Sequence, residues 1–592
     1  MSWWVRAYRR GLPVQARRAL AGCVAPQTRR QVKARLAAAP SAGQAVAGLR
    51  TTWEARRFPE VSTGRGRVLC PVEGVPRAVA VVPDLSPFQA RARNLSAVCS
   101  ALDRAGVDYF AVRGLSDTAA TVGVAADDRP AVFEALAELC KDHPAYVSSA
   151  GVPRRKNRGG RGWLPATWRG LAQADVIRLT QYYGSPDMQL VLGRTYGCDI
   201  EFWTRTDGQL IAPRPNRTTA QVPLAPAPVE VSDALFTGLS SPFAGPAGSP
   251  RLQVRSRAEF AAPPPEGIRF PIDAVYTWVD GGDPDWMRRR AEAGGTGYHA
   301  EAANAARYIS RDELRYSLRS LHQHAPWIRT VHLVTDDQTP DWLDTSGPGL
   351  RVVSHRDIFS DPALLPTFNS HAIESQLHHI DGLSEHFLYF NDDVFLGLPT
   401  VPQDFFHANG ISKFFTSSAL VPLGTPCEDD PPVAAAGKNN RSLLQSRFGT
   451  TLTQKMKHTP HALRRSILTE IEETFPRPHT ATAGNRFRSI DDLSITSSLY
   501  HYYAFQSARA VPGDLRYDYL DLSQPNTPTR LDRLLAHRDR HVFCINDTVS
   551  TGHDADEQQA LLGPFLETYF PVAGPFERGN GTRGARPGGT RE

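Results

Sequence analysis

Apolar strand segments alternate with amphipathic helical segments in the second half of the chain, and this order constrains the fold more than any other feature. A helix is predicted between the first two strands because Leu314, Leu318 and Leu321 lie on one face. It should stop near Pro326. The predicted strands cover residues 272–279, 330–337 and 387–390. Repeated strand, helix, strand units are typical of an α/β nucleotide-binding sheet, so we predict an α/β mixed sheet flanked by helices.

Two adjacent carboxylates follow the predicted strand at 387–390. Asp392 and Asp393 cannot continue into a core without a severe desolvation cost, so they should lie where the strand leaves the sheet. Open α/β sheets bind ligands at the carboxyl ends of their strands, and hard oxygen ligands there could hold Mg²⁺ or Mn²⁺ against a diphosphate. The alternative is a turn or a helix cap, since Asn-Asp pairs commonly form turns.

Two histidines flank a predicted helix start. Between His458 and His461, Thr459 is a suitable helix cap and Pro460 suits the first helical turn. A helix amino terminus favours a phosphate, and a histidine there can add a proton or a hydrogen bond. A histidine beside a cap can equally be a structural residue.

Four segments carry a specific resemblance to a known family. IDAVYTWVDG, RDELRYSLRSLHQHAPWIRTVHLVTDDQTPDWL with its extension FNSHAIESQLHHIDGLSEHFLYFNDDVFLG, HTPHALRRSILTEIEETFP and INDTVS resemble the four conserved regions of the Stealth family. Members of that family transfer a sugar 1-phosphate from a nucleotide sugar to an acceptor hydroxyl. They include bacterial capsular polysaccharide phosphotransferases and the catalytic subunit of animal N-acetylglucosamine-1-phosphotransferase. The resemblance covers residues 272–550 and implies a glycosyltransferase-A-like, nucleotide-sugar-binding fold.

The resemblance implies a set of catalytic residues and metal ligands. The implied catalytic residues are Glu374, Asp392, His458 and Arg488. Glu374 would orient the acceptor or take its proton, and Arg488 would meet phosphate, as suits a guanidinium. The implied ligands of Mg²⁺ or Mn²⁺ are Asp392, Asp393 and Asp492, and the secondary candidates are His461, Asn546 and Asp547. Without the resemblance, Glu374 would be interpreted as a solvated helix residue. Arg488 and Asp492 would be interpreted as a salt bridge at a helix entry.

The first strand end would hold the nucleotide. The residues implied for nucleotide-sugar binding are Trp278, Asp280, Gly281, Arg311, Arg315 and Asp336. Trp278 could instead be a core residue. Some relatives have Asn where this chain has Asp280, which leaves the identity of the donor open. No GxxxxGK[ST] motif is present, so an ATP-dependent kinase is disfavoured.

A chain of 592 residues exceeds one compact core. The predicted units are a basic amino-terminal segment, a smaller α/β domain, a Pro-rich linker, the Stealth-like domain and a disordered tail, at residues 1–60, 61–211, 212–270, 271–573 and 574–592. In the second unit, Gly114, Leu115 and Ser116 could be the relic loop of a degenerate nucleotidyltransferase-like domain, with Asp199 and Glu201 sharing a strand face. No DxD follows that loop, which favours a supporting role.

The net charge of +6 is unevenly placed: residues 1–50 contain ten Arg or Lys and no Asp or Glu. With Trp3, Trp4 and Tyr8, this segment suits an anionic membrane surface or a lipid-linked acceptor, or else a plain solvated basic helix. No nucleic-acid motif is present, so that partner is not expected. The chain lacks a secretion signal and an 18-residue apolar run, and we expect it in the cytoplasm, with a peripheral contact at the inner face of the plasma membrane as an option. The seven cysteines form no CxxC pair, so neither zinc binding nor a disulfide framework is expected.

These observations predict a sugar-1-phosphate transferase of capsular or extracellular polysaccharide biosynthesis. Its partners would be a nucleotide-sugar donor, which the resemblance implies is UDP-linked, and an oligosaccharide or polysaccharide acceptor. The alternatives are an ordinary metal-dependent glycosyltransferase and a non-catalytic scaffold of polysaccharide assembly. The released product separates the three, since it would be a nucleoside monophosphate, a nucleoside diphosphate or nothing.

Overall fold

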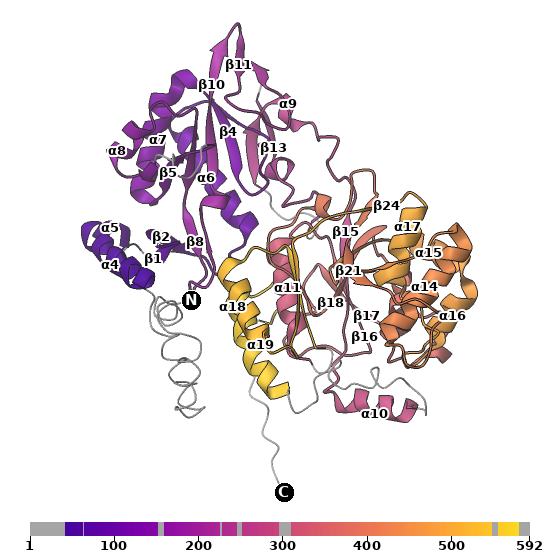
Figure 1. Cartoon of the computed structure of the whole chain (residues 1–592). Coiled ribbons are helices and arrows are strands. Elements are labelled where there is room, and N and C mark those ends of the chain that lie inside the picture. Colours follow the sequence, from indigo (N-terminus) through magenta and orange to yellow (C-terminus); the bar gives the residue numbers. More distant parts are fainter. Residues whose placement is uncertain are drawn as a thin grey trace, which may run out of the picture.

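The computed structural model of the chain describes residues 42–62, 64, 66–151, 159–224, 228–244, 252–294, 310–547 and 555–578. It contains a smaller amino-terminal domain, indigo to magenta in Figure 1, and a larger carboxyl-terminal domain, magenta to yellow. Both combine sheets with flanking helices, and the sheets include parallel and antiparallel pairs. The predicted α/β class with mixed sheets is confirmed.

The amino-terminal domain is built on an eight-stranded sheet. Its central strand β10 pairs in parallel with β4 and antiparallel with β7, and helices α6 and α7 pack beside it. These elements are β4 (Ala120–Ala125), β7 (Val176–Thr180), β10 (Cys198–Thr206), α6 (Pro87–Arg104) and α7 (Arg129–Asp142). The remaining strands of the sheet are β3 (Tyr109–Ala111), β5 (Tyr146–Ser149), β6 (Gly159–Arg161), β11 (Gln209–Ile211) and β12 (Gln221–Pro223).

A second, four-stranded sheet lies below the first in Figure 1 and includes β1 (Arg67–Val72), β2 (Val75–Val81), β8 (Tyr182–Gly184) and β9 (Val191–Leu192). Helix α4 (Ala42–Arg57) contacts β1 and β2, so the end of the predicted basic segment belongs to this domain. Residues 1–41 lie outside the described part of the chain.

Asp199 and Glu201 share one face of β10, as predicted, because Arg214 bonds to both carboxylates at 2.8 and 2.7 Å. Arg178 adds a second bond to Asp199 at 2.6 Å. Both carboxylates are buried, and each of these buried charges has an arginine as its cationic partner. This pairing fits the supporting role favoured for the amino-terminal domain.

The Pro-rich segment 212–270 is not a linker, contrary to the prediction. It forms β12, β13 (Val229–Ser232), β14 (Gln253–Ser256) and α9 (Ala258–Ala261), with β13 antiparallel to β14. Its apolar side chains complete the amino-terminal core with Val222, Phe236, Val254 and Phe260. The buried guanidinium of Arg113 donates to three carbonyls of the segment, those of Leu235, Phe260 and Ala262. The Pro-rich composition wrongly indicated a linker, because a few apolar residues are enough to dock short strands on a core.

The carboxyl-terminal domain is centred on a five-stranded sheet of order β17-β16-β15-β18-β23. Its strands are β15 (Ile272–Thr277), β16 (Val331–Thr335), β17 (Leu350–Ser354), β18 (His386–Asn391) and β23 (His461–Arg464). The first four run parallel, which confirms the predicted alternation, and β23 runs antiparallel to β18. Helix α11 (Glu313–His324) lies between β15 and β16 in the chain and ends before Pro326, as predicted.

A smaller sheet of β19 (Val394–Leu396), β26 (Val542–Asn546) and β25 (Tyr517–Asp521) lies against α11. Figure 1 shows a group of helices on one side of the domain, including α14 (Pro432–Phe448), α15 (Arg465–Thr474), α16 (Pro476–Gly484) and α17 (Tyr500–Gln506). On the other side are α18 (Thr527–His537) and α19 (Ala555–Tyr569). Short segments between the strands include α10 (Pro284–Ala293), α12 (His355–Ile358), α13 (Ser370–Ser375) and the 3₁₀ turn η7 (Leu377–His379).

The helix predicted to begin at Pro460, with Thr459 as its cap, begins five residues later, at Arg465. His461 to Arg464 instead form strand β23, whose register sets His461 opposite Tyr389 and Leu463 opposite Phe387. The edge of β18 captures these residues, and a local cap pattern cannot reveal such long-range pairing. His458 therefore does not lie at a helix amino terminus, and the phosphate argument based on a helix dipole does not apply to it.

Residues 574–578 belong to the folded domain, contrary to the predicted disordered tail, of which residues 579–592 lie outside the described part. Glu577 pairs with Leu343 in an isolated bridge, and its carboxylate accepts hydrogen bonds from Arg315 at 2.6 Å and Arg319 at 2.7 Å. The side chains of Arg319 and Glu577 are only 5% and 6% exposed. Although burial favours the protonated acid, these guanidinium groups hold the pKa of Glu577 below its ordinary value.

We expect Glu577→Ala to lower the melting temperature of the carboxyl-terminal domain by roughly 6 °C or more. Removing one partner of a buried ion pair costs about 3 kcal/mol, and each kcal/mol shifts a domain of this size by about 2 °C. Since the pKa of Glu577 is depressed by folding, its stabilisation should be complete above pH 4.5 and be lost as the pH falls further. Thermal melts of Glu577→Ala and of the exposed control Glu557→Ala over this pH range check the prediction. Equal melting temperatures would contradict it.

Candidate active site

A cavity of about 540 Å³ opens at the carboxyl ends of strands β15, β18 and β26. Parallel strands bring the residues that follow them to one edge of a sheet, which explains why segments far apart in the sequence meet here. The predicted site residues that line it are Trp278, Arg311, Asp392, Asp393, His458, Arg488, Asn546 and Asp547. The adjacent carboxylates thus lie at the strand exit, as the sequence predicts.

A second cavity of about 180 Å³ shares Asn391, Lys455, His458 and Arg488 with the first and is therefore adjacent to it. Glu374 and His461 line this side cavity. Ten of the predicted site residues line the main cavity or the side cavity, and His458 and Arg488 line both.

Asp393 is the most connected carboxylate of the site. Its Oδ1 accepts a hydrogen bond from His458 Nε2 at 3.2 Å, and its Oδ2 accepts one from Asn546 Nδ2 at 2.9 Å. The thiol of Cys544 contacts the same Oδ2 at 3.3 Å. Burial favours the neutral ring of His458, but the charge and hydrogen bond of Asp393 outweigh it and raise the pKa of His458. Asp393 therefore favours the protonated ring of His458.

Asp392 has two acidic neighbours, Asp393 and Glu313. Burial, followed by the charges of Glu313 and Asp393, raises the pKa of Asp392 well above its ordinary value. Burial likewise raises the pKa of Glu313 to about 7. Like charges gathered in one place disfavour ionisation, so a cation among these carboxyl groups would be strongly bound. Glu313 lines the cavity and was missed by the sequence analysis, which gave it no role in the site.

Arg488 is held in place from two sides. One of its terminal nitrogens donates to His371 Nε2 at 2.9 Å, and the other donates to Ser370 Oγ. Because His371 Nε2 accepts, the ring proton is on Nδ1, which lies 3.3 Å from Asp492 Oδ2. Asp492 thus acts on Arg488 through His371, a residue to which the sequence gave no role.

Asp492 itself does not line either cavity. Its carboxylate also accepts hydrogen bonds from Asn369, Asn485 and the backbone of Ser489, at 2.9, 2.8 and 3.0 Å. These donors together with His371 occupy both oxygens in a fully buried position. Because Asp492 lines neither cavity, it does not lie with Asp392 and Asp393 as a candidate metal ligand. It reaches Arg488 through His371 rather than through a helix-entry salt bridge, and so positions the loop that carries Arg488.

Glu374 is buried, so the alternative reading of it as a solvated helix residue does not hold. Its Oε2 accepts hydrogen bonds from Thr496 Oγ1 at 2.5 Å and from Ser497 Oγ at 3.1 Å. The same carboxylate oxygen is thus oriented by two hydroxyl groups beside the side cavity. This arrangement suits a carboxylate that accepts a proton from a hydroxyl in that cavity.

Comparison with known proteins identifies the family. An exopolysaccharide phosphotransferase of Streptomyces coelicolor is 50% identical over 97% of this chain and 98% of its own length. Four Stealth protein models match in the expected order, and conserved regions 1 to 4 correspond to residues 270–298, 307–414, 457–505 and 532–587. The chain belongs to the Stealth family. A second Streptomyces coelicolor exopolysaccharide phosphotransferase is 50% identical over 97% of each chain, and CpsY of Mycobacterium tuberculosis, also an exopolysaccharide phosphotransferase, is 34% identical over 83% of this chain and 90% of its own.

Among solved structures, the galactosyltransferase LgtC in complex with donor and acceptor sugar analogs aligns with a TM-score of 0.25 and 10% identity. The alignment covers 50% of this chain and 96% of LgtC. Within the described residues, no helix is both long and apolar enough to cross a membrane.

The Stealth regions meet in the cavity. Region 1 contributes Trp278, region 2 the Asp392–Asp393 pair, region 3 His458 and Arg488, and region 4 Asn546 and Asp547. Arg311 Nη2 donates to Asp547 Oδ2 at 2.9 Å, which ties the start of α11 to the end of β26. INDTVS was the shortest of the matching segments, yet its first residues lie beside the catalytic candidates.

Several residues implied for nucleotide binding do not line the main cavity. Arg315 pairs with Glu577 at 2.6 Å, and Asp336 pairs with Arg289 at 2.7 Å. Asp280 and Gly281 are likewise absent from the lining, and the carboxylate of Asp280 accepts from the Gly282 amide at 2.8 Å as in a turn. The wall near Trp278 is instead formed by residues that the sequence analysis missed, including Trp286, Phe368 and His355.

Proposed function

We propose that this Stealth protein transfers a sugar 1-phosphate from a nucleotide sugar, UDP-linked by resemblance, to a hydroxyl of an acceptor sugar and releases a nucleoside monophosphate. The relatives named exopolysaccharide phosphotransferases support a role in exopolysaccharide biosynthesis. The observation that carries the proposal is the gathering of Asp392, Asp393, His458 and Arg488 around one cavity. Carboxylates, an imidazole and a guanidinium are what in-line phosphoryl transfer requires for charge neutralisation and proton transfer.

In the proposed reaction, the acceptor oxygen forms a bond to the phosphorus next to the sugar, and the bond from that phosphorus to the nucleoside monophosphate breaks. Glu374 takes the proton of the attacking hydroxyl, since its oriented oxygen borders the side cavity. Arg488 neutralises charge on the transferred phosphoryl group, and its bonds to Ser370 and His371 fix its direction. His458 donates a proton or hydrogen bond to the phosphoryl oxygens or the leaving phosphate.

The donor set of the cavity fits a hard divalent cation. Asp392 and Asp393 provide carboxylate oxygens, and burial together with the neighbouring carboxylates raises the pKa of Asp392 well above its ordinary value, so a cation there would relieve the repulsion between these acids. We propose that Asp392 and Asp393 hold Mg²⁺ or Mn²⁺, which would neutralise the diphosphate of the donor. Asn546 holds Asp393 in the required direction through its hydrogen bond.

We expect chelation to abolish turnover and Mg²⁺ or Mn²⁺ to restore it, because the clustered carboxylates would repel an unneutralised diphosphate. The measurement is nucleotide release after exhaustive dialysis against a chelator, with each cation added back separately. Ca²⁺ is the matched control for charge without the same coordination geometry. Full turnover in the chelated protein would refute the metal assignment.

The released nucleotide tests the function itself. We propose incubation of the full chain with a panel of nucleotide sugars and acceptor oligosaccharides, followed by identification of the nucleotide and of the product linkage. A nucleoside monophosphate and a phosphodiester product are expected. Release of a nucleoside diphosphate would indicate an ordinary glycosyltransferase, and no release with any donor would favour the scaffold.

The basic amino terminus is a separate proposal. We propose that it contacts anionic membrane at the cytoplasmic face, where a nucleotide-sugar donor is available. Because α4 packs on β1 and β2, the deletion that tests this should remove residues 1–41 and leave α4 intact. We expect weaker binding to vesicles containing anionic lipid and unchanged turnover of a soluble acceptor. Equal vesicle binding by the shortened and full chains would discard the membrane role.

A further inference from the structure

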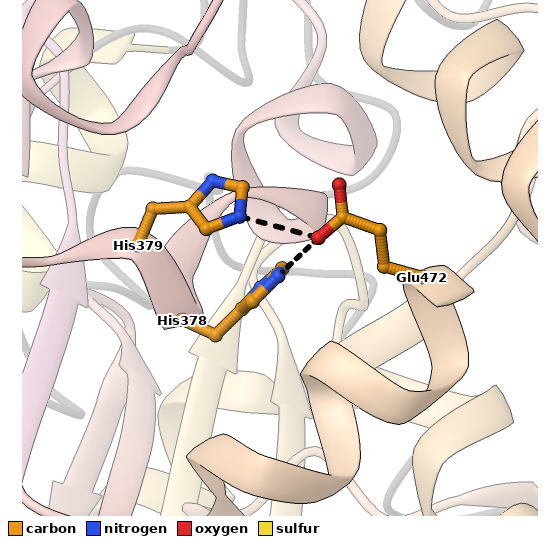
Figure 2. Close-up of side chains that lie close together, drawn as sticks. All are labelled: His378, His379 and Glu472. Atoms are coloured by element: carbon orange, nitrogen blue, oxygen red, sulfur yellow. Dashed lines mark hydrogen bonds and ion pairs between the residues drawn. The ribbon is translucent and has the colours of Figure 1, made fainter.

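Three histidines and a glutamate gather in the helical part of the carboxyl-terminal domain, outside both cavities. His378 and His379 come from η7, Glu472 from α15 and His479 from α16. Glu472 Oε2 lies 2.6 Å from His378 Nε2 and 3.2 Å from His379 Nε2, as Figure 2 shows. The other carboxylate oxygen of Glu472, Oε1, lies 3.7 Å from His479 Nδ1. Four groups of metal-ligand type therefore converge from segments more than 90 residues apart.

The outer nitrogens of two of these rings are fixed by backbone carbonyls. His379 Nδ1 lies 3.0 Å from the carbonyl oxygen of Ile358, and His479 Nε2 lies 3.1 Å from that of Ser375. A carbonyl oxygen only accepts, so each outer nitrogen must carry a proton. If the rings of His379 and His479 are neutral, their inner nitrogens carry lone pairs that point toward Glu472. The carboxylate of Glu472 also offers only lone pairs.

Lone pairs directed at one another require either a second proton on the rings or a cation. Histidines that bind metals commonly donate their other ring N–H to a backbone carbonyl, which fixes the tautomer and the ring direction. Imidazole and carboxylate together form the ligand set of many zinc sites, and three such ligands with a water complete a tetrahedral shell. His378 is buried, whereas the side chains of His379 and Glu472 are 32% and 35% exposed, which leaves room for that water.

We propose that His378, His379 and Glu472 bind a zinc ion that fixes η7 to α15. The site has a consequence for the catalytic candidates, because His479 lies beside Glu472 and bonds to the carbonyl of Ser375, the neighbour of Glu374. Zinc at this position would brace the helix that carries Glu374. The cysteine pattern gave no indication of such a site, since it contains no cysteine.

Metal content and cobalt spectroscopy test the proposal on the full chain, without any turnover assay. After dialysis against Zn²⁺ and removal of free metal, we expect one zinc per chain that is bound by neither Asp393 nor Cys544. Replacement by Co²⁺ should give the intense visible bands of a tetrahedral site without the near-ultraviolet bands of a thiolate ligand. A thiolate band would assign the metal to the Asp393, His458 and Cys544 group instead, and would overturn the proposal.

Variants locate the metal. Glu472→Gln and the double variant His378→Ala, His379→Ala should weaken zinc binding at least ~10-fold, the lower range for disturbing a metal's ligand environment. The exposed neighbour Glu473→Gln is the matched control and should bind zinc normally. Zinc should raise the melting temperature of the unmodified chain and of the control but not of Glu472→Gln. Normal zinc binding by Glu472→Gln, or no Co²⁺ binding by the unmodified chain, would show a protonated hydrogen-bond cluster and refute the site.

Discussion

We expect Asp393→Asn to lower sugar-phosphate transfer by roughly 10³-fold while the melting temperature changes little. Loss of one preorganised electrostatic group costs 10²- to 10³-fold, and Asp393 serves both His458 and the proposed cation. The amide would also set an NH₂ group against His458 or Asn546, which donate to the present carboxylate. Asp392→Asn should be similarly impaired through the cation alone.

The exposed residue Asp532 on α18 provides the matched control, and Asp532→Asn should transfer normally. Steady-state release of the nucleoside monophosphate, with circular dichroism to compare folding, makes the measurement. Transfer by Asp393→Asn within tenfold of the unmodified chain would remove this carboxylate from the reaction.

We expect His458→Ala and Arg488→Ala each to lower kcat by roughly 10²-fold or more, the range for one positioned acid or charged donor. KM should change less, because both groups are proposed to act mainly on charge that develops during transfer. Arg488→Lys should not recover the rate, since an ammonium cannot bond to Ser370 and His371 in the two directions that the guanidinium uses.

His537→Ala, on an exposed turn of α18, is the control for removal of an imidazole. His461→Ala is a poor control because His461 is buried and its Nδ1 lies 2.9 Å from His501 Nε2, so its loss should also destabilise the fold. Near-normal kcat in His458→Ala together with a large loss in a folded His461→Ala would transfer the acid role to His461. If both variants are fully active, proton transfer occurs elsewhere.

The part of the site formed by strand ends could be predicted from the sequence. Apolar runs that stop abruptly at acidic residues locate Asp392 and Asp393 at the exit of β18, and the structure places them there. The position of Trp278 at the end of β15 followed from the predicted strand, whereas its place in the site was implied by the resemblance. Local periodicity is sufficient for such positions because the strand itself fixes where the next residue lies.

The residues that reach the site through long-range packing could not be predicted in this way. Glu313 is the first residue of α11 and lines the cavity, and the φ of 63° at Asp312 just before it is a chain turn that local periodicity does not reveal. The support of Arg488 by His371 and Asp492 joins positions more than 100 residues apart. His461 was assigned to a helix because its pairing with β18 has no local signal.

The docking of β12, β13 and β14 onto the amino-terminal core has a consequence for how the two domains can cooperate. The connection that remains before β15 consists of residues 263–271, and such a tether spans at most roughly 30 Å even when fully extended. A spacer of the length first predicted, 212–270, would let one domain sweep a wide volume around the other. With the short tether, any ligand held by the amino-terminal domain stays close to the main cavity and is presented to it at high effective concentration.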